Sequence, residues 1–227
     1  MITNYSENNH LVLIGKIVNE KKFSHEVYGE KFYLFNLEVP RLSETADIIP
    51  ITISERLLTD LDISTGKKAI IEGQFRSYNG YENEKSRLIL TVFAKEITIL
   101  PDDEELPISK EKVSNEVILS GYICKKPIYR QTPFKREIAD VLLAVNRAYN
   151  KSDYIPCIAW GRNARFCQNM DVGTEVKVVG RVQSRGYEKK LEDGTILNKV
   201  AYEVSVISME VINQKNNEED NSQQEAI

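Results

Sequence analysis

The strongest constraint on the fold is an internal repeat, because the chain carries the same pattern twice, displaced by 106 positions. Residues 9–17 (NHLVLIGKI) match residues 115–123 (NEVILSGYI). One residue later in register, residues 66–73 (GKKAIIEG) match residues 173–180 (GTEVKVVG). A period of this length is too long for a solenoid unit and indicates a duplicated domain. The length of 227 residues fits two domains of about 100 residues, each able to bury its own core.

The repeat divides the chain into four segments that differ in charge. The N-terminal domain at residues 1–100 has a net charge of −2, the proline-containing linker at 101–114 has −3, the C-terminal domain at 115–213 has +4, and the tail at 214–227 has −3. The tail is polar with almost nothing to bury, so we expect it to be disordered. The overall charge of −4 therefore conceals a basic second domain, which is compatible with binding a polyanion.

Each copy has the pattern of β-strands. Apolar residues alternate with polar ones, and this predicts half-buried strands. A short helix is predicted at residues 163–170, with a counterpart at residues 55–61. Glycines inside strands often mark bulges or tight bends, and four are found here: Gly15, Gly73, Gly121 and Gly180. Five strands with one short helix between the third and fourth indicate an all-β protein of two five-stranded OB-fold barrels, a fold that commonly binds oligonucleotides.

Several classes of protein find no support in the sequence. No apolar run of about 18 residues predicts a membrane span, and residues 1–9 lack the apolar core of a signal peptide. Three cysteines without CxxC spacing suggest reduced thiols in a cytoplasmic protein, and two histidines are too few for a histidine metal site. No phosphate-binding loop or catalytic motif is found. We therefore expect no enzyme activity, no cofactor and no metal.

The second copy resembles the bacterial single-stranded DNA-binding protein family over roughly residues 113–212. The resemblance depends on several short motifs in the family's order and spacing: NEVILSG at 115–121, LAVNR at 143–147, YIPCIAWG at 154–161 and GRVQSR at 180–185. It implies sequence-tolerant binding of single-stranded DNA in replication, recombination and repair, without catalysis and in the nucleoid. Such binding uses aromatic rings that stack on bases and cations that contact phosphates.

The resemblance also implies candidate site residues in the second copy. The stacking candidates are Tyr149, Tyr154, Trp160 and Tyr187, with Phe134 as a weaker one. Tyr154 and Trp160 are six positions apart, so in a regular strand they share one face. The candidates for phosphate contact are Arg130, Arg147, Arg162, Arg181, Arg185 and Lys189. Taken singly, a strand tyrosine more often packs and a strand arginine often only solvates a surface, so the prediction concerns the set.

The first copy lacks most of this set. Its counterparts of Tyr149, Tyr154 and Trp160 are Ser43, Ile48 and Ser54. Weak DNA binding through Arg41, Arg76, Tyr78 and Tyr81 is one interpretation, and a role mainly in assembly is the one we favour. Family members with two domains per chain form homodimers, so a homodimer is expected here.

Two alternatives to single-stranded DNA binding remain open at this point. The chain could be an OB-fold replication or primosome adaptor that acts mainly through protein–protein interaction, or a single-stranded RNA binder. The acidic run at 218–220 and the apolar end at 226–227 also resemble, in rudiment, the family's partner-recruiting tail, but they lack its proline and aromatic ending. Recruitment of replication or repair proteins and simple solubilisation are both open for this tail.

Overall fold

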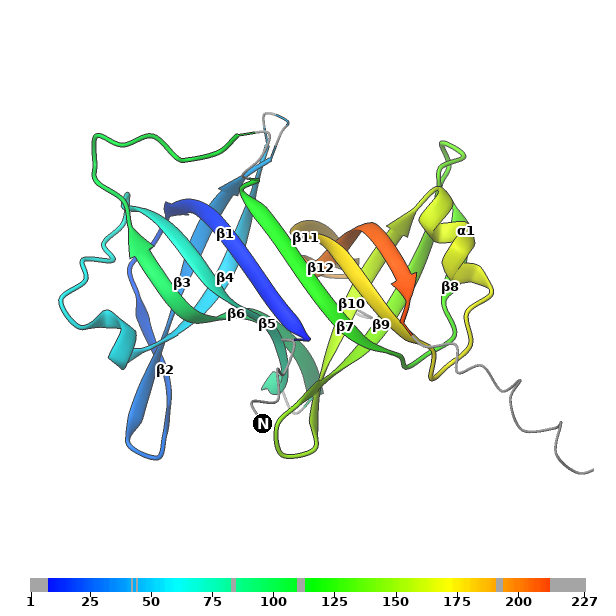
Figure 1. Cartoon of the computed structure of the whole chain (residues 1–227), viewed down its shortest axis with the longest axis horizontal. Coiled ribbons are helices and arrows are strands. Elements are labelled where there is room, and N and C mark those ends of the chain that lie inside the picture. The colour runs from blue at the N-terminus through cyan, green and yellow to red at the C-terminus, as the bar shows by residue number, and fades with distance from the viewer. Residues whose placement is uncertain are drawn as a thin grey trace, which may run out of the picture.

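The protein is described by a computed structural model, which covers residues 8–41, 43, 45–82, 85–109, 113–190 and 194–212. It contains two β-barrels that lie side by side (Figure 1). Barrel 1 consists of β1 (Asn9–Ile17), β2 (Lys22–Val27), β3 (Glu30–Pro40), β4 (Ala46–Ser54), the 3-10 helix η1 (Glu55–Leu58), β5 (Lys68–Glu82) and β6 (Lys85–Ile99). Barrel 2 consists of β7 (Asn115–Ile123), β8 (Ile128–Gln131), β9 (Glu137–Arg147), β10 (Lys151–Trp160), helix α1 (Arg162–Gln168), β11 (Glu175–Lys190) and β12 (Ile196–Val211).

The two barrels have the same topology. In barrel 1, β1 pairs with β3 and β5, β3 pairs with β4, β5 pairs with β6, and a short parallel pairing of β4 with β6 closes the ring. Barrel 2 repeats every one of these pairings, including a parallel contact between β10 and β12. The all-β prediction of two OB-fold barrels with a short helix after the third core strand is confirmed.

Each barrel has one strand more than the five that were expected. The extra strands are β2 and β8, which pair with the outer edges of β3 and β9. All six residues of β2 are exposed, so no alternation of buried and exposed positions marks this strand in the sequence. The backbone of β2 is held by the β3 ladder rather than by burial of its own side chains.

The interior glycines allow strands to approach closely at bulges. The pairing of β5 with β6 shifts register between Glu72 and Gly73, and that of β11 with β12 shifts between Val179 and Gly180. A Cβ atom on Gly180 would lie 2.5 Å from the carbonyl oxygen of Ser205. Only glycine fits such a backbone approach, which explains why both copies carry it at this point.

The barrels are joined by antiparallel pairing of their first strands, β1 and β7, with Leu11 opposite Val117. This seam is close to two-fold symmetric: the amide of Ile14 donates to the carbonyl of Ser114, and the amide of Ser120 donates to that of Asn8, both at 2.8 Å. The sheet therefore runs continuously through twelve strands of the described chain.

The same symmetry holds for two asparagines that clamp β5 and β11. The side chain of Asn9 bonds both the carbonyl and the amide of Phe75, at 2.7 and 2.9 Å. The side chain of Asn115 does the same with Val182, at the same two distances. Each asparagine thus fixes the first strand of its barrel against the long strand at the point where that strand leaves the core.

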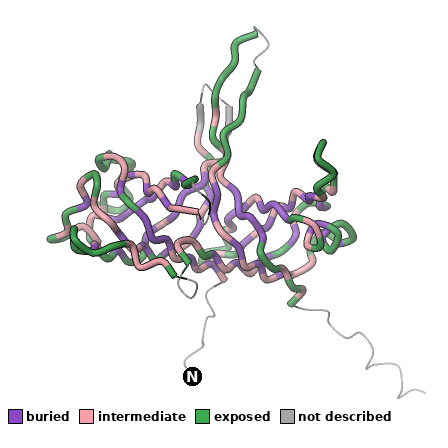
Figure 2. Tube along the Cα trace, turned by 90° about the horizontal axis from the view of Figure 1, so that it is seen from above, coloured by how far each residue is buried: buried purple, intermediate pink, exposed green. Residues whose placement is uncertain are grey.

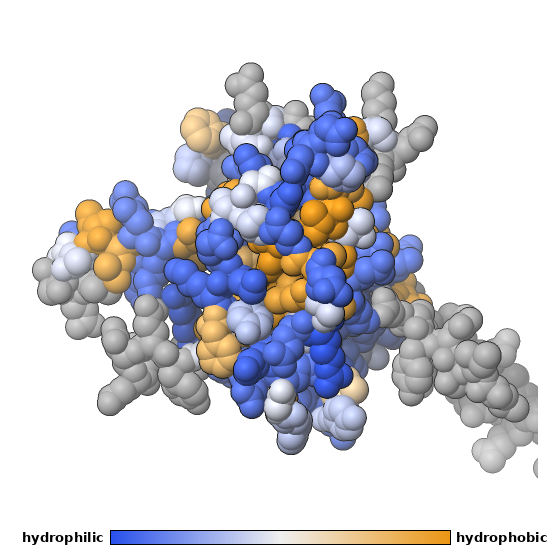
Figure 3. Space-filling view, turned by 90° about the vertical axis from the view of Figure 1, so that its left-hand side faces the viewer, coloured by the Kyte–Doolittle hydropathy of each residue, from blue (hydrophilic) through white to orange (hydrophobic). Residues whose placement is uncertain are grey.

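Two long hairpins project together from the middle of the molecule, on the same side. They are the ends of β5–β6 and β11–β12, and the core beneath them is buried (Figure 2). Their described residues include exposed apolar side chains, namely Leu88, Ile196, Leu197 and Val200. Seen from the end of barrel 1, the projection carries apolar patches among hydrophilic residues (Figure 3).

Candidate nucleic-acid interface

The outer face of barrel 2 brings most of the candidate residues onto one continuous sheet. Strand register fixes which side chains share this face: Trp160 is opposite Ile138, and Tyr154 is opposite Ala144. The predicted sharing of one face by Tyr154 and Trp160 holds in this register, about 20 Å apart along β10. The strand order β8-β9-β10-β12-β11 then carries the face across to Arg185, Tyr187 and Lys189 on β11.

The aromatic candidates are accessible enough to stack on bases. Trp160 and Tyr187 each expose 39% of their surface, and Tyr154 exposes 48%. Rings that are held by the sheet on one side and open on the other can receive a base with little rearrangement. Phe134 is 87% exposed but lies in the β8–β9 turn, off the sheet.

Tyr149 occupies an unusual backbone position. It lies in the turn between β9 and β10 with φ of 61°, followed by Asn150 with φ of 54°. Left-handed backbone is uncommon for a bulky residue. The ring is 94% exposed, so burial of the side chain does not compensate for the backbone strain. A ring held out at the tip of a tight hairpin is suited to contact something outside the chain.

Four of the six candidate cations already have carboxylate partners. Arg130 pairs with Asp140 at 2.9 Å, and Arg185 pairs with Glu203 at 3.3 Å, both on the outer face. Arg147 and Arg181 pair instead with two aspartates at the seam, described below. Arg162 and Lys189 are exposed, and no ion pair to either is found within the described residues. Phosphate contact by these six side chains remains a prediction.

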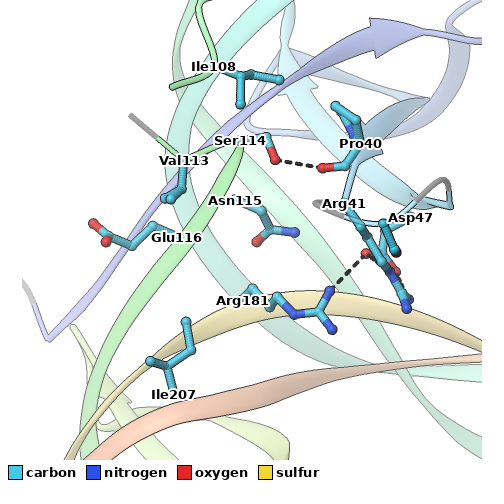
Figure 4. A pocket seen from close by; sticks show the side chains of 11 residues that line it. Pro40, Arg41, Asp47, Ile108, Val113, Ser114, Asn115, Glu116, Arg181 and Ile207 are labelled. Carbon is cyan, nitrogen blue, oxygen red and sulfur yellow. Dashed lines mark hydrogen bonds and ion pairs between the residues drawn. The ribbon is translucent and has the colours of Figure 1, made fainter. Parts of the chain in front are cut away.

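One end of the seam is a tight network around Asp47. This carboxylate accepts two hydrogen bonds from Arg41, at 2.7 and 2.6 Å, and one from the amide of Ser184 in barrel 2, at 2.7 Å. Arg181 approaches it at 3.6 Å, so its guanidinium turns toward barrel 1 (Figure 4). Although burial acts to raise the pKa of Asp47, the hydrogen bonds from Arg41 and Ser184 hold it below its usual value.

The other end of the seam, around Asp153, is the symmetric counterpart but is looser. Asp153 accepts a 2.7 Å hydrogen bond from the amide of Ser77 in barrel 1, just as Asp47 does from Ser184. Its ion pair joins Arg147 Nε and Asp153 Oδ2 at 3.4 Å, and neither atom has a hydrogen-bond partner in the part of the chain that the structure describes. Burial raises the pKa of Asp153, despite that hydrogen bond and the charges of Arg147 and Arg76. An arginine–aspartate pair therefore occurs at both ends of the seam, but the carboxyl pKa is lowered at Asp47 and raised at Asp153.

A cavity of about 450 Å³ opens beside Asp47 (Figure 4). Its wall combines Arg41 and Arg181 with apolar side chains from the linker and β12, among them Ile108, Val113 and Ile207. Ser114 closes its rim with a 2.6 Å hydrogen bond to the carbonyl of Pro40. The two guanidiniums face Asp47 rather than the open space, so this cavity offers a mostly apolar surface.

Barrel 1 carries aromatic side chains on its own outer face, but at positions that have no aromatic counterpart in barrel 2. Phe93 on β6 lies under the guanidinium of Arg76, 4.4 Å from its ring centre. Phe32 packs on Phe93 at 5.7 Å and stacks on His25 at 4.9 Å. The comparison of equivalent positions in the two copies missed Phe32, Phe93 and His25. The outward period-two positions of β6 were the signal that could have found Phe93.

Parts of the expected site fall elsewhere. The side chain of Tyr81 and the whole tail at 214–227 lie outside the described residues. Cys124, Cys157 and Cys167 are free thiols, and burial raises the pKa of Cys167 to about 11. The described part of the chain contains no cluster of three His, Cys, Asp or Glu side chains arranged to hold a metal. No helix among the described residues is long and apolar enough to cross a membrane.

Comparison with known proteins adds three findings. The model of the single-strand binding protein family matches residues 114–222. The single-stranded DNA-binding protein B of Bacillus subtilis is 36% identical over 86 residues, which cover 34% of this chain and 74% of that protein. The chain spans about half to three quarters of the length of the curated relatives it matches.

Two solved structures are also similar. Wild-type single-stranded DNA binding protein from Thermus aquaticus is 18% identical with a TM-score of 0.67, covering 95% of this chain and 98% of that one. At this identity the likeness shows a shared fold. A dimeric structure of the N-terminal domain of PriB protein from Thermoanaerobacter tencongensis is 55% identical, covers 42% of this chain and 99% of that one, and has a TM-score of 0.38.

Proposed function

The chain belongs to the single-strand binding protein family, and from this premise we propose that it binds single-stranded DNA on the outer face of barrel 2. Binding is non-catalytic and tolerant of sequence, because stacking on a ring does not distinguish bases and phosphates are the same at every step. The bound strand is protected during replication, recombination and repair, in the cytoplasm at the nucleoid.

The observation that carries the proposal is the single outward sheet face shared by Tyr154, Trp160 and Tyr187. These three half-open rings lie on β10 and β11, with the cations of β8 and β11 beside them. Acidic partners accompany Arg130 and Arg185, so the face is less basic than its arginines alone suggest. Stacking is therefore the main source of affinity, and phosphate contact adds a salt-dependent part.

The proposal is tested by titrating the fluorescence of Trp160, the chain's single tryptophan, with poly-dT. Wild-type fluorescence is quenched, and Tyr154→Ala and Tyr149→Ala weaken binding roughly 5- to 150-fold each, the loss of one stacked base. Phe166→Ala is the control, since this ring is 47% exposed, close to the 48% of Tyr154, but lies on α1 and not on the sheet. Absence of quenching together with absence of a gel-shifted complex refutes DNA binding and leaves the adaptor interpretation. Competition with a matched RNA measures the preference for DNA.

The projecting hairpins support a second part of the proposal, a homodimer. Ile196 is 58% exposed and Val200 is 44% exposed, and their register partners Lys190 and Gly186 place both on the hairpin face opposite to Tyr187 and Lys189. Leu88 adds to the apolar surface of the same projection. Burying these side chains against a second copy would remove them from water, which is the main driving force of such association. Light scattering should give twice the chain mass of 26.0 kDa for the wild type and a lower mass for Ile196→Asp. A wild-type mass of one chain at micromolar concentration contradicts the homodimer. Recruitment of partner proteins by the tail remains part of the proposal that only binding assays with the full chain can test.

A further inference from the structure

A cavity of about 510 Å³ lies on the outer face of barrel 1, next to the seam. Its wall includes Tyr78 and Arg76 from β5, Thr91 and Phe93 from β6, and His25 from β2. The sixth main contributor is Arg147, which comes from barrel 2. The volume is within the range of pockets that hold small organic ligands, and the wall combines rings with two guanidiniums.

The seam holds the two halves of this cavity together. Ser77 lies between Arg76 and Tyr78. Its amide donates a 2.7 Å hydrogen bond to the carboxylate of Asp153, and its hydroxyl oxygen accepts one of the same length from the amide of Tyr154. These bonds place the candidate stacking residue Tyr154 of barrel 2 directly beside the β5 segment that lines the cavity. The outer face of barrel 2 is therefore joined to the cavity by direct hydrogen bonds between β10 and β5.

The side chains of the cavity are prepared for a planar, anionic ligand. Phe93 supports the Arg76 guanidinium from below, and Gln74 fixes it with hydrogen bonds of 3.1 and 2.6 Å. A guanidinium held flat in this way can stack on a base or bind a phosphate. Tyr78 is 46% exposed and offers an open ring beside it.

The charges of the cavity are incompletely satisfied within the chain. Arg76 and Arg147 face one carboxylate, Asp153, which leaves one positive charge in excess. Arg147 Nε and Asp153 Oδ2 are buried and face each other at 3.4 Å, and neither has a hydrogen-bond partner among the described residues. An ion pair of this length holds the Arg147 guanidinium less tightly than the two short hydrogen bonds that hold Arg41, so a phosphate competes with the carboxylate more easily at Arg147.

We infer that this cavity binds one nucleotide of the single strand where the strand crosses from barrel 2 to barrel 1. The base stacks on Tyr78 or on the Arg76 plane, and Arg147 contacts the adjoining phosphate. The inference rests on the proposed function, and it gives barrel 1 a direct part in binding in place of the assembly role that its sequence favoured. At the other end of the seam two arginines also face one carboxylate, but Arg41 holds Asp47 with two short hydrogen bonds and the cavity wall is mostly apolar, so the crossing is assigned to the Asp153 end.

The first test uses the wild-type chain, so that no variant has to fold. An oligo-dT in which bromodeoxyuridine replaces some thymidines is crosslinked by light to the protein, and crosslinked peptides are mapped by mass spectrometry. Crosslinks are expected at Tyr78 as well as at the rings of barrel 2. Crosslinks confined to barrel 2 overturn the inference and leave the proposed function intact.

The second test measures the affinity for poly-dT and its dependence on salt. Tyr78→Ala should weaken binding roughly 5- to 150-fold, the loss of one stacked base. Arg147→Gln should lower the slope of log affinity against log salt by about 0.7, the loss of one phosphate contact on a single strand. Lys16→Gln is the matched control, because it removes one exposed cation of barrel 1 that does not line the cavity. Circular dichroism melting shows that each variant is folded.

The outcomes separate the two proposals. If Tyr154→Ala weakens binding while Tyr78→Ala and Arg147→Gln behave like Lys16→Gln, the cavity does not bind the strand although barrel 2 does. If the wild type binds no single strand at all, the proposed function fails first.

Discussion

The two barrels differ where they meet solvent and agree where they meet each other. The clamps of Asn9 and Asn115 have the same geometry, and the bulges at Gly73 and Gly180 fall at the same place. On the outer faces, by contrast, Tyr154 of barrel 2 has Ile48 as its counterpart. A duplicated barrel keeps the interactions that close it and join it to its twin, while its exposed face is free to carry a different set of rings.

The loss of an aromatic side chain at one position does not remove aromatic rings from the whole outer face of a barrel. Barrel 1 lacks the tryptophan and tyrosine of β10, yet it has Phe93 under Arg76 and the half-exposed Tyr78 on neighbouring strands. Because all strands of a barrel contribute to one outer surface, a ring can move from one strand to the next and still reach the same ligand.

The largest expected effect comes from removing both rings of β10. Tyr154→Ala with Trp160→Ala should weaken binding to poly-dT by about 2 to 6 kcal/mol, because two stacked bases lose their partners. Ile48→Ala is the control, since Ile48 holds the position of Tyr154 in barrel 1 and is 37% exposed. The double variant has no tryptophan whose quenching could be followed, so the affinities of both variants are measured by fluorescence anisotropy of labelled oligo-dT. Equal losses for the double variant and for Ile48→Ala would show that the outer faces do not differ in the way described.

The sequence predicts those features of the two barrels that depend on a local pattern of residues. Alternation predicted the core strands, and the interior glycines predicted the bulges at Gly73 and Gly180, because both follow from which neighbours a strand must fit. The added strands β2 and β8 were not foreseen, since neither shows a regular alternation of burial.

The partners of the arginines could not be foreseen either. Asp47 and Ser184 are 137 positions apart in the chain, and only the pairing of β1 with β7 brings them together. From sequence, Arg147 and Arg181 were indistinguishable from cations that face solvent. In the structure both belong to the seam, whereas Lys189 remains open to solvent.

A second prediction compares the two ends of the seam. Asp47→Asn should lower the free energy of unfolding by roughly 2 to 3 kcal/mol, because the buried carboxylate loses a bidentate bond to Arg41. Asp153→Asn should change it by less than about 1 kcal/mol, since its ion pair is long and the asparagine oxygen can still accept the amide of Ser77. Urea unfolding at pH 7 measures both, and each variant is the control for the other. Equal losses would mean that the two ends are equivalent in energy.

The pH dependence of these two variants should have opposite signs. The folded-state pKa of Asp47 is lowered, so its stabilisation is present above the ordinary carboxyl pKa of about 3.9 and is lost as the pH falls through the folded value. The folded-state pKa of Asp153 is raised, so the wild type loses stability as the pH rises from the ordinary value through the folded one. Relative to wild type, Asp47→Asn should therefore be most destabilised at neutral pH and least at pH 3, and Asp153→Asn should compare better at neutral pH than at pH 3.

The smallest expected effect on DNA affinity comes from removing an acidic side chain on the binding face of barrel 2. Glu203 holds Arg185 at 3.3 Å and accepts a 2.7 Å hydrogen bond from Gln183, so a phosphate must compete with it for the guanidinium. Glu203→Gln should strengthen binding to poly-dT by about 0.5 to 1 kcal/mol at low salt, the value of one partly exposed ion pair. Glu210→Gln removes the same charge from the same strand, where it pairs only distantly with Lys177 at 3.9 Å, and serves as the control.

The sign of that change decides what the acid does. Stronger binding by Glu203→Gln than by Glu210→Gln shows that the carboxylate competes with phosphate and limits affinity. Weaker binding shows instead that Glu203 holds Arg185 in the orientation that contacts the strand, and the affinity then depends on a positioned cation more than on a free one. Either result separates barrel 2 from barrel 1, where Gln74 rather than a carboxylate orients Arg76.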